Sequence, residues 1–401
     1  MSSFLVALLT LIVAAMIWAG HACLWTYVLN ILYGRKLPKP ILKAWRIVSF
    51  VVIVFGWPAV LVGLVLVYKI DLFPGPDDPP RNPIPALPFF TIGTYALFCL
   101  ILATRFIGIT VMRLRAVPPA SIVSSASSMV DYGKQSASGV DMAGKGKWWW
   151  LARLPFTCAF RVEYSSYTLK LPNLPAAWDG LTILHLSDFH FHGTPTKAFF
   201  EAVFAEIRMR WPRTDVVALT GDFLDTDQHA EWIEPLFSQL EAQEGRFAIL
   251  GNHDDFHRPE FVRTELQRAG YTVLGNHWLD ATIRGVRCRI VGHEGPWYLP
   301  FPEACSRTDV PKICLSHSPD NIYWAAEQGC AIVLSGHVHG GQIRIPVVGP
   351  IFVPSIYSRR FDSGIFDVDG STLVVSRGLG GKEPIRFRCP PQVIRITLRS
   401  A

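Results

Sequence analysis

The spacing of hydrophobic residues changes near residue 115. Before that point, three long apolar runs at about residues 4–32, 47–67 and 87–112 fill most of the chain. Each run is near or above the roughly 20 residues that a helix needs to cross a bilayer. Beyond it, short apolar runs alternate with stretches of helical spacing. The pattern predicts three transmembrane helices within residues 1–115, followed by an α/β domain.

Positive charge gathers beside the apolar runs. Charged residues make up 17% of the chain, and the formal net charge is +6. The loop between the first two runs is basic and carries Arg35, Lys36, Lys39, Lys43 and Arg46. The next loop carries Asp71, Asp77, Asp78 and Arg81. The positive-inside rule therefore predicts that the α/β domain of this multi-pass protein of the inner (cytoplasmic) membrane faces the cytoplasm. Because the excess positive charge sits beside the apolar runs, it is a topology signal rather than a nucleic-acid footprint. We expect the bilayer as a partner, no nucleic acid and no protein partner.

Residues 116–160 are interpreted as a linker that ends in an aromatic segment. Pro118 to Lys147 is rich in Ser, Ala and Gly, which predicts a flexible connector. Trp148, Trp149 and Trp150 follow it, flanked by basic residues. They either anchor the next domain at headgroup depth or pack in its core, and the sequence favours neither.

Residues 161–401 show the alternation of an α/β domain, whose loops at strand ends form the site. We expect strands at 182–186, 215–220, 247–250, 271–274, 288–291, 312–315, 331–334, 373–375 and 393–398. We expect helices at 195–210, 230–243 and 258–269.

Five short polar strings mark this domain, and most of them follow an apolar strand. They are Leu186–His190, Gly221–Asp225, Gly251–Asp254, Ser316–His317 and Gly336–Gln342. A ligand on such a loop is held by a rigid sheet while its side chain points into an open cleft. No Cys-x-x-Cys pair occurs among the eight cysteines, so a zinc ribbon or a thioredoxin-like motif is unsupported.

The residue types in these strings suit divalent metal ions. Aspartate and histidine with a lone asparagine favour Mn²⁺, Fe²⁺, Zn²⁺ or Co²⁺, whereas Ca²⁺ favours oxygen alone. Asp188 and His190 offer two donors from one loop, His337 and His339 offer two imidazoles from another, and Asp222 can bridge two ions. Two ions about 4 Å apart can share a hydroxide that attacks phosphorus in an in-line displacement.

His253 has a different predicted role, because it follows Asn252, the neutral oxygen ligand. It is placed to protonate or stabilise a leaving oxygen, and Asp225 is a plausible partner that orients its ring.

Together the five strings resemble the metal motifs of the calcineurin-like metallophosphoesterase superfamily, over about Tyr164 to the C-terminus. The resemblance implies an α/β fold, a two-sheet αββα sandwich, with a dinuclear centre. One metal would take Asp188, His190, Asp222 and His339. The other would take Asp222, Asn252, His317 and His337. His253 would be the proton donor, assisted by Asp225.

A finer likeness concerns two strings near the C-terminus. Gly336–Gln342, followed by Pro346, and Ser376–Gly380 are similar to a bacterial membrane-associated branch. That branch includes phosphodiesterases and UDP-2,3-diacylglucosamine pyrophosphohydrolases of lipid A synthesis. Arg377 would then contact phosphate, although a surface arginine at a strand end is an equal alternative. Thr226 and Asp254 stand where protein phosphatases of the superfamily carry Arg and Glu, which disfavours a phosphoprotein substrate.

An apolar loop contains Trp297, Tyr298 and Phe301, and we consider two roles for it. It either accepts an acyl chain or is a well-packed surface loop, and the second role is favoured because scattered apolar surface residues are normal.

The sequence thus predicts a membrane-anchored phosphoester hydrolase with two divalent ions, manganese favoured. Its substrate would be lipid-linked, such as UDP-2,3-diacylglucosamine. Two alternatives stay open, namely a phosphodiesterase acting on soluble substrates and a membrane sensor that binds phosphate ligands without turnover.

Overall fold

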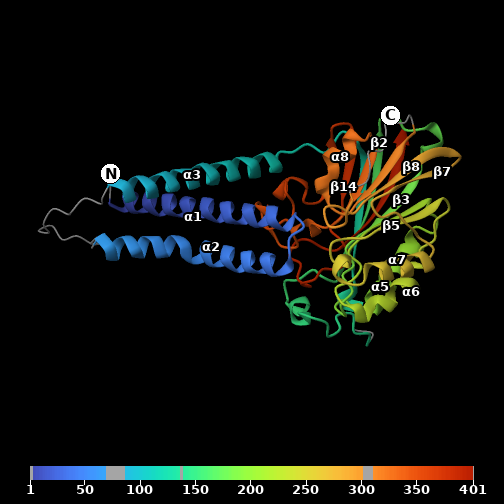
Figure 1. Cartoon of the computed structure of the whole chain (residues 1–401), viewed down its shortest axis with the longest axis horizontal. Coiled ribbons are helices and arrows are strands. Elements are labelled where there is room, and N and C mark those ends of the chain that lie inside the picture. Colours follow the sequence, from blue (N-terminus) through green and yellow to red (C-terminus); the bar gives the residue numbers. More distant parts are fainter. Residues whose placement is uncertain (1–2, 69–85, 136–138, 301–309, 401) are drawn as a thin grey trace, which may run out of the picture. The chain divides into compact units, whose positions relative to one another are not determined.

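A computed structural model describes residues 3–68, 86–135, 139–300 and 310–400 (Figure 1). The chain forms two compact units. The first comprises Met1–Tyr33 and Leu37–Ala116, and the second comprises Gly34–Lys36 and Val117–Ala401.

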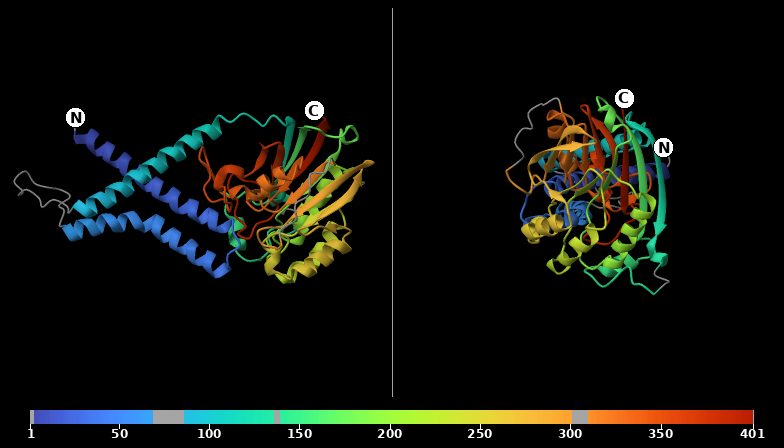
Figure 2. Two further views of the ribbon diagram at one scale, coloured as in Figure 1. Left: turned by 45° about the horizontal axis from the view of Figure 1, so that its top comes forward. Right: turned by 90° about the vertical axis from the view of Figure 1, so that its right-hand side faces the viewer.

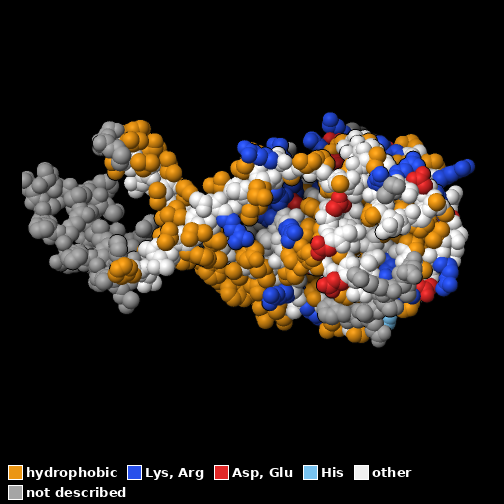
Figure 3. Space-filling view, turned by 90° about the horizontal axis from the view of Figure 1, so that it is seen from above, with side chains coloured by type: hydrophobic (Ala, Val, Ile, Leu, Met, Phe, Trp, Pro, Cys, Tyr) orange, Lys and Arg blue, Asp and Glu red, His pale blue; other side chains and the backbone are white. Residues whose placement is uncertain are grey.

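The first unit contains three long helices, α1 (Ser3–Tyr33), α2 (Lys39–Tyr68) and α3 (Ala86–Leu114). All three are long and apolar enough to cross a membrane. Their visible surface in Figure 3 is largely hydrophobic, whereas that of the second unit is mixed with Lys, Arg, Asp and Glu. The three helices expected from the sequence are confirmed. The acidic loop expected between the second and third lies outside the described residues.

A seven-stranded sheet forms the first layer of the second unit. Its order is β1 (Ile122–Asp131), β2 (Arg161–Leu171), β15 (Gln392–Ser400), β3 (Thr182–Leu186), β4 (Val216–Thr220), β5 (Gly245–Ile249) and β6 (Thr272–Val273). Strands β3 to β6 are parallel, so their carboxyl ends meet at one edge of the sheet.

A six-stranded sheet forms the second layer. Its order is β13 (Gly364–Val368), β14 (Ser371–Val375), β10 (Ile332–Ser335), β9 (Lys312–Ser316), β8 (Val286–His293) and β7 (Trp278–Ile283). Strands β8, β9, β10 and β14 are parallel and bring a second set of carboxyl ends together. A small ribbon pairs β11 (Arg344–Ile345) with β12 (Gly349–Pro350).

Helices cover the outer faces of the two sheets (Figure 2). Those packed on the seven-stranded sheet are α5 (Lys197–Arg210), α6 (Ile233–Phe237) and α7 (Pro259–Arg268). The six-stranded sheet packs against α8 (Ile322–Glu327), and the short α4 (Tyr132–Gln135) follows β1.

The core confirms the predicted αββα sandwich. Ile313 and Leu315 of β9 lie between the sheets with Ile183 and Val216, whereas Cys314 faces the α8 side. This period of two is that of a strand buried on both faces.

Part of the segment interpreted as a flexible linker forms a strand and a short helix, so the prediction was wrong there. It contains β1, which pairs antiparallel with β2 at the sheet edge through Ile122 and residues 124–131, with an irregularity between Ile122 and Ser124. Most side chains of β1 are exposed, and five of them are serine or alanine, so no hydrophobic alternation marked the strand. Its stability comes from ladder hydrogen bonds to β2, which local sequence does not show.

The helix expected over 230–243 is shorter than predicted. A 3-10 turn at Asp227–Trp232 leads into α6, which ends at Phe237. The N–H groups of Gln243 and Glu244 donate to the carbonyls of Thr214 and Asp215, which draws this segment towards the sheet instead of continuing the helix.

The three tryptophans lie in and before a 3-10 turn at Trp149–Arg153. Their side chains are 44%, 38% and 50% exposed, so the core-packing alternative was wrong. The alternative of a membrane anchor stays a prediction.

Candidate metal centre

The loops that follow five strands, three in one sheet and two in the other, converge on one site. Asp188 and His190 follow β3, Asp222 follows β4, and Asn252 follows β5. The second sheet contributes residues after β9 and β10, namely His317, His337 and His339. The order of the parallel strands thus assembles all seven predicted ligands.

The backbone at this site is held in an unusual conformation. Five ligand residues have positive φ: Asp188 (55°), His190 (50°), Asp222 (59°), His337 (68°) and His339 (51°). Non-glycine residues rarely adopt this region, and such strain clusters at functional sites because the surrounding structure must enforce it. The loops are therefore shaped to present these side chains.

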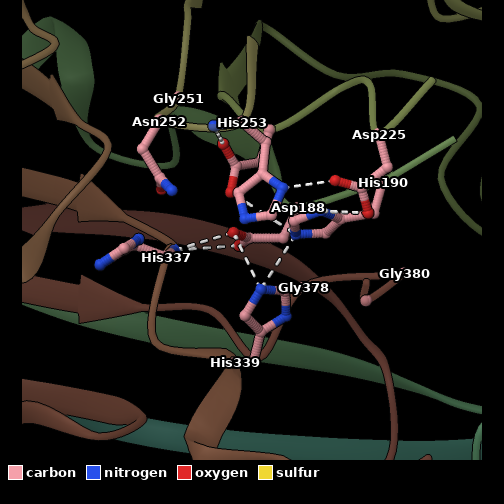
Figure 4. Close-up of polar contacts among 12 residues, drawn as sticks. Asp188, His190, Asp225, Gly251, Asn252, His253, His337, His339, Gly378 and Gly380 are labelled. Atoms are coloured by element: carbon pink, nitrogen blue, oxygen red, sulfur yellow. Dashed lines mark hydrogen bonds and ion pairs between the residues drawn. The ribbon is translucent and has the colours of Figure 1, made fainter. Parts of the chain in front are cut away.

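The first group of ligands surrounds a common point, and Figure 4 shows Asp188, His190 and His339 directed towards one another. Nε2 of His190 lies 3.0 Å from Nε2 of His339 and 3.5 Å from Oδ2 of Asp222. Nε2 of His339 lies 3.6 Å from Oδ1 of Asp188. Converging imidazole and carboxylate lone pairs of this kind fit a divalent cation.

The second group uses the other oxygen of Asp222. Its Oδ1 lies 3.4 Å from Nε2 of His317, and Oδ1 of Asn252 lies 3.0 Å from the same nitrogen. Nδ1 of His317 lies 2.6 Å from the carbonyl oxygen of Thr220, a contact that directs its Nε2 into the site. Nε2 of His337 is buried and has no hydrogen-bond partner among the residues that the structure describes. An unsatisfied buried nitrogen beside a carboxylate is well suited to a metal ion.

Charge also favours cations here. Asp188 and Asp222 are fully buried, and their ion pairs within the described residues are all with histidine. Burial lowers the pKa of His317, but the charge and hydrogen bond of Asp222, with the charge of Asp188 and the carbonyl of Thr220, together outweigh it and raise the pKa to about 9. Burial, reinforced by His317, holds the pKa of His337 well below its ordinary value, so this ring keeps a free lone pair.

Asp225 connects the ligands to His253, the predicted proton donor. Oδ1 of Asp225 contacts Nδ1 of His253, and its Oδ2 lies 3.2 Å from Nδ1 of His190 (Figure 4). Burial alone would raise the pKa of Asp225, yet the two imidazoles hold it well below its usual range. The carboxylate therefore orients both rings, as the sequence predicted for His253.

Asp254 is a supporting residue whose role the sequence analysis did not find. Its buried carboxylate accepts the backbone N–H groups of Asp222, Phe223, Leu224 and Gly251 at 2.8–3.1 Å. This fixes the loop after β4 against the loop after β5. The string Gly-Asn-His-Asp contained the signal, because a short acidic residue near a turn often accepts backbone N–H groups.

Arg386 is a second supporting residue that sequence reasoning missed. It is 2% exposed, and its Nη2 donates to the carbonyls of Arg377 and Gly380 at 2.8 and 2.6 Å. The same nitrogen lies 3.5 Å from Nδ1 of His339. Arg386 thereby ties the loop after β14 to His339, one of the predicted ligands.

Arg377 is not directed at the ligands by any described contact. Its Nη2 pairs with Glu163 of β2 at 2.9 Å. Its aliphatic stem lies beside Gly340 in the loop after β10, called the metal loop here because it carries the predicted ligands His337 and His339. Its role in phosphate binding stays a prediction.

The apolar loop predicted to be at the surface places its tryptophan in the interior. Trp297 is 4% exposed, and its ring lies 4.6 Å from that of His337 and 5.4 Å from that of His317. Its ring packs against the second ligand group, and a role of this loop in accepting an acyl chain stays a prediction. Phe301 lies outside the described residues.

Three further histidines of this unit make contacts of their own. His185 is buried against Thr220, and burial lowers its pKa to about 3. His192 lies 3.1 Å from the carbonyl of Gly381, and His257 lies 3.2 Å from Asp227.

The fold and the ligand groups define a metal-dependent phosphoester hydrolase. Residues 181–341 match the family model for calcineurin-like phosphoesterases. The chain is 31% identical to the uncharacterized metallophosphoesterase YkuE of Bacillus subtilis over 249 residues, which cover 60% of this chain and 86% of that protein. The chain therefore belongs to the metallophosphoesterase family.

Two further relatives match shorter stretches. Phosphodiesterase YaeI of Escherichia coli is 31% identical over 97 residues, 24% of this chain and 36% of that protein. UDP-2,3-diacylglucosamine pyrophosphatase LpxG of Chlamydia muridarum is 37% identical over 93 residues, 21% of this chain and 28% of that protein.

The predicted role of His253 as proton donor can be tested with substrates whose leaving groups differ in their need for a proton. If His253 protonates the leaving oxygen, His253→Ala should lower kcat on an alkyl phosphodiester by about 10²–10⁴-fold. The loss should be much smaller on bis(p-nitrophenyl) phosphate, whose leaving group needs little protonation. Asp225→Asn should show the same selectivity. Equal losses on both substrates, measured by steady-state kinetics, would contradict this role.

Proposed function

We propose that this protein is a membrane-anchored phosphoester hydrolase that uses two divalent metal ions. The observation that carries the proposal is the placement of Asp222, whose two carboxylate oxygens face separate ligand groups at 3.4 and 3.5 Å. Asp188, His190 and His339 would complete one ion's shell, and Asn252, His317 and His337 the other's. Manganese is the favoured metal, because the mixed Asp, Asn and His donors suit a borderline cation.

The chain's own residues have distinct tasks in this proposal. Two bound ions would supply an activated water and neutralise charge on the phosphate oxygens. His253 is 19% exposed at its side chain, the most accessible of the site histidines in ion pairs with Asp222 or Asp225. It gives its proton to the leaving oxygen, while Asp225 fixes its ring. Asp254 keeps the loops that carry Asp222 and His253 in register.

The proposed substrate is a lipid-linked diphosphate such as UDP-2,3-diacylglucosamine, which would place the protein in lipid A synthesis. Two observations support it. The chain carries three helices able to cross a membrane, and a tethered enzyme meets membrane-bound substrate at high local concentration. The relative LpxG is named for cleaving this class of molecule.

Product analysis tests the substrate. We expect the detergent-solubilised chain with Mn²⁺ to release UMP from UDP-2,3-diacylglucosamine, because water attacks one phosphorus of the diphosphate. Asp222→Asn should lose this activity. Cleavage of glycerophosphodiesters alone would instead favour the alternative of a phosphodiesterase acting on soluble substrates; the relative YaeI is named a phosphodiesterase. No turnover of either substrate would favour the phosphate-binding sensor.

We also propose that the catalytic unit faces the cytoplasm. The basic loop between α1 and α2 supports this orientation through the positive-inside rule.

A reporter fused to the C-terminus tests the orientation. Alkaline phosphatase, which is active only outside the cytoplasm, should be inactive in this fusion, and green fluorescent protein should fluoresce. Active alkaline phosphatase would reverse the proposed topology.

A further inference from the structure

The ribbon that follows the metal loop exposes apolar side chains to solvent. Its first strand, β11, begins two residues after Gln342, the last residue of the string that contains His337 and His339. Ile343, Ile345 and Val347 are 46%, 40% and 71% exposed. Three such residues within five positions form a local patch rather than a scattered surface.

In this ribbon the apolar side chains face solvent and a charged side chain faces inward, which is the reverse of the usual pattern in a half-exposed strand. Arg344, between the two isoleucines, turns inward: its Nη1 donates to Asp362 at 2.6 Å and to the carbonyl of Gly340 at 3.0 Å. Asp362 is buried. The ion pair faces inward and the isoleucines face outward. This arrangement indicates that the outer side of the ribbon contacts an apolar environment as well as water.

A second exposed apolar segment adjoins the ribbon through Phe387. The N–H of Phe387 donates to the carbonyl of Gln342, and its carbonyl accepts the N–H of Arg344. The ring of Phe387 lies 6.2 Å from that of Phe156, which is 53% exposed and follows the 3-10 turn of the tryptophan segment. We call the exposed apolar side chains of these two segments the apolar rim: Trp148, Trp149, Trp150, Phe156, Ile343, Ile345 and Val347.

Basic residues accompany the rim along the same segments. The exposed ones are Lys145, Lys147, Arg153, Lys382 and Arg388. The guanidinium of Arg153 lies 4.7 Å from the centre of the Trp149 ring. Exposed tryptophan with lysine and arginine is the composition of segments that lie at the headgroup level of anionic bilayers.

Only a short connection joins α3, a candidate membrane helix, to the second unit, so the second unit stays near the bilayer that α3 would cross. Seven residues separate the end of α3 at Leu114 from the start of β1 at Ile122. Fully extended, such a segment with its two flanking bonds spans at most about 25–30 Å. A bilayer is thus always within reach of the unit that carries the rim.

We propose that the apolar rim docks on the lipid bilayer, inserting Ile343, Ile345 and Val347 at the headgroup–acyl boundary. Docking brings the metal loop of His337 and His339 to the lipid surface, since the ribbon continues directly from that loop. This inference does not depend on the identity of the substrate, and it assigns the rim to lipid rather than to a protein partner.

Fluorescence quenching in nanodiscs tests the docking on the full chain. An environment-sensitive NBD label is attached at Val347→Cys and, as the matched control, at Asp369→Cys in the exposed turn between β13 and β14. The nanodiscs contain phosphatidylcholine and phosphatidylglycerol, with or without doxyl-labelled lipid, and the parent protein carried through the same labelling gives the background from native cysteines. We expect doxyl lipid to quench the label at 347 several-fold more than the label at 369.

A second variant separates lost docking from lost folding. In the Val347→Cys background, Ile343→Asp with Ile345→Asp should remove the excess quenching and leave the hydrolysis of soluble bis(p-nitrophenyl) phosphate within about two-fold, because neither isoleucine is a site residue. Equal quenching at 347 and 369 would overturn the proposal. Excess quenching that persists in the double variant of the active protein would also overturn it.

Discussion

The shared carboxylate of Asp222 is the interaction on which the site depends. It is buried between two groups of donors, and each of its oxygens faces a different histidine, His190 on one side and His317 on the other. Burying such a charge is unfavourable unless cations or hydrogen bonds compensate it. The protein supplies histidines rather than lysines or arginines around it within the described residues, which leaves room for metal charge.

The fold holds this carboxylate and its neighbours in loops with a strained backbone. Parallel strands from both sheets end beside one another, and the ligand residues that follow β3, β4 and β10 have left-handed backbone. Asp254 holds the loop after β4 by accepting its N–H groups, and Arg386 holds the loop after β14 by donating to its carbonyls. The sandwich core between the sheets fixes the strand ends, so the site does not rely on its loops alone.

The sequence predicted which residues the fold brings together, because residue chemistry and position after a strand coincide in the predicted ligands. Asp222 and His317 each follow an apolar strand, and their side-chain types suit the same metals. The sequence did not predict the supporting residues Asp254 and Arg386, because their roles depend on backbone groups that are distant in sequence. Strand β1 was also missed, because a serine-rich edge strand has no hydrophobic alternation and owes its conformation to β2. The ribbon from Ile343 was hidden for a similar reason: only the fold shows that Arg344 faces inward.

Electron paramagnetic resonance of the manganese-loaded chain tests the central claim most directly. Two Mn²⁺ ions bridged by the Asp222 carboxylate should bind per chain and give an exchange-coupled spectrum. Asp222→Asn should abolish the coupling and reduce bound manganese, whereas Asp369→Asn should change neither. A single bound ion, or two ions whose spectra show no coupling in the unsubstituted protein, would contradict the account.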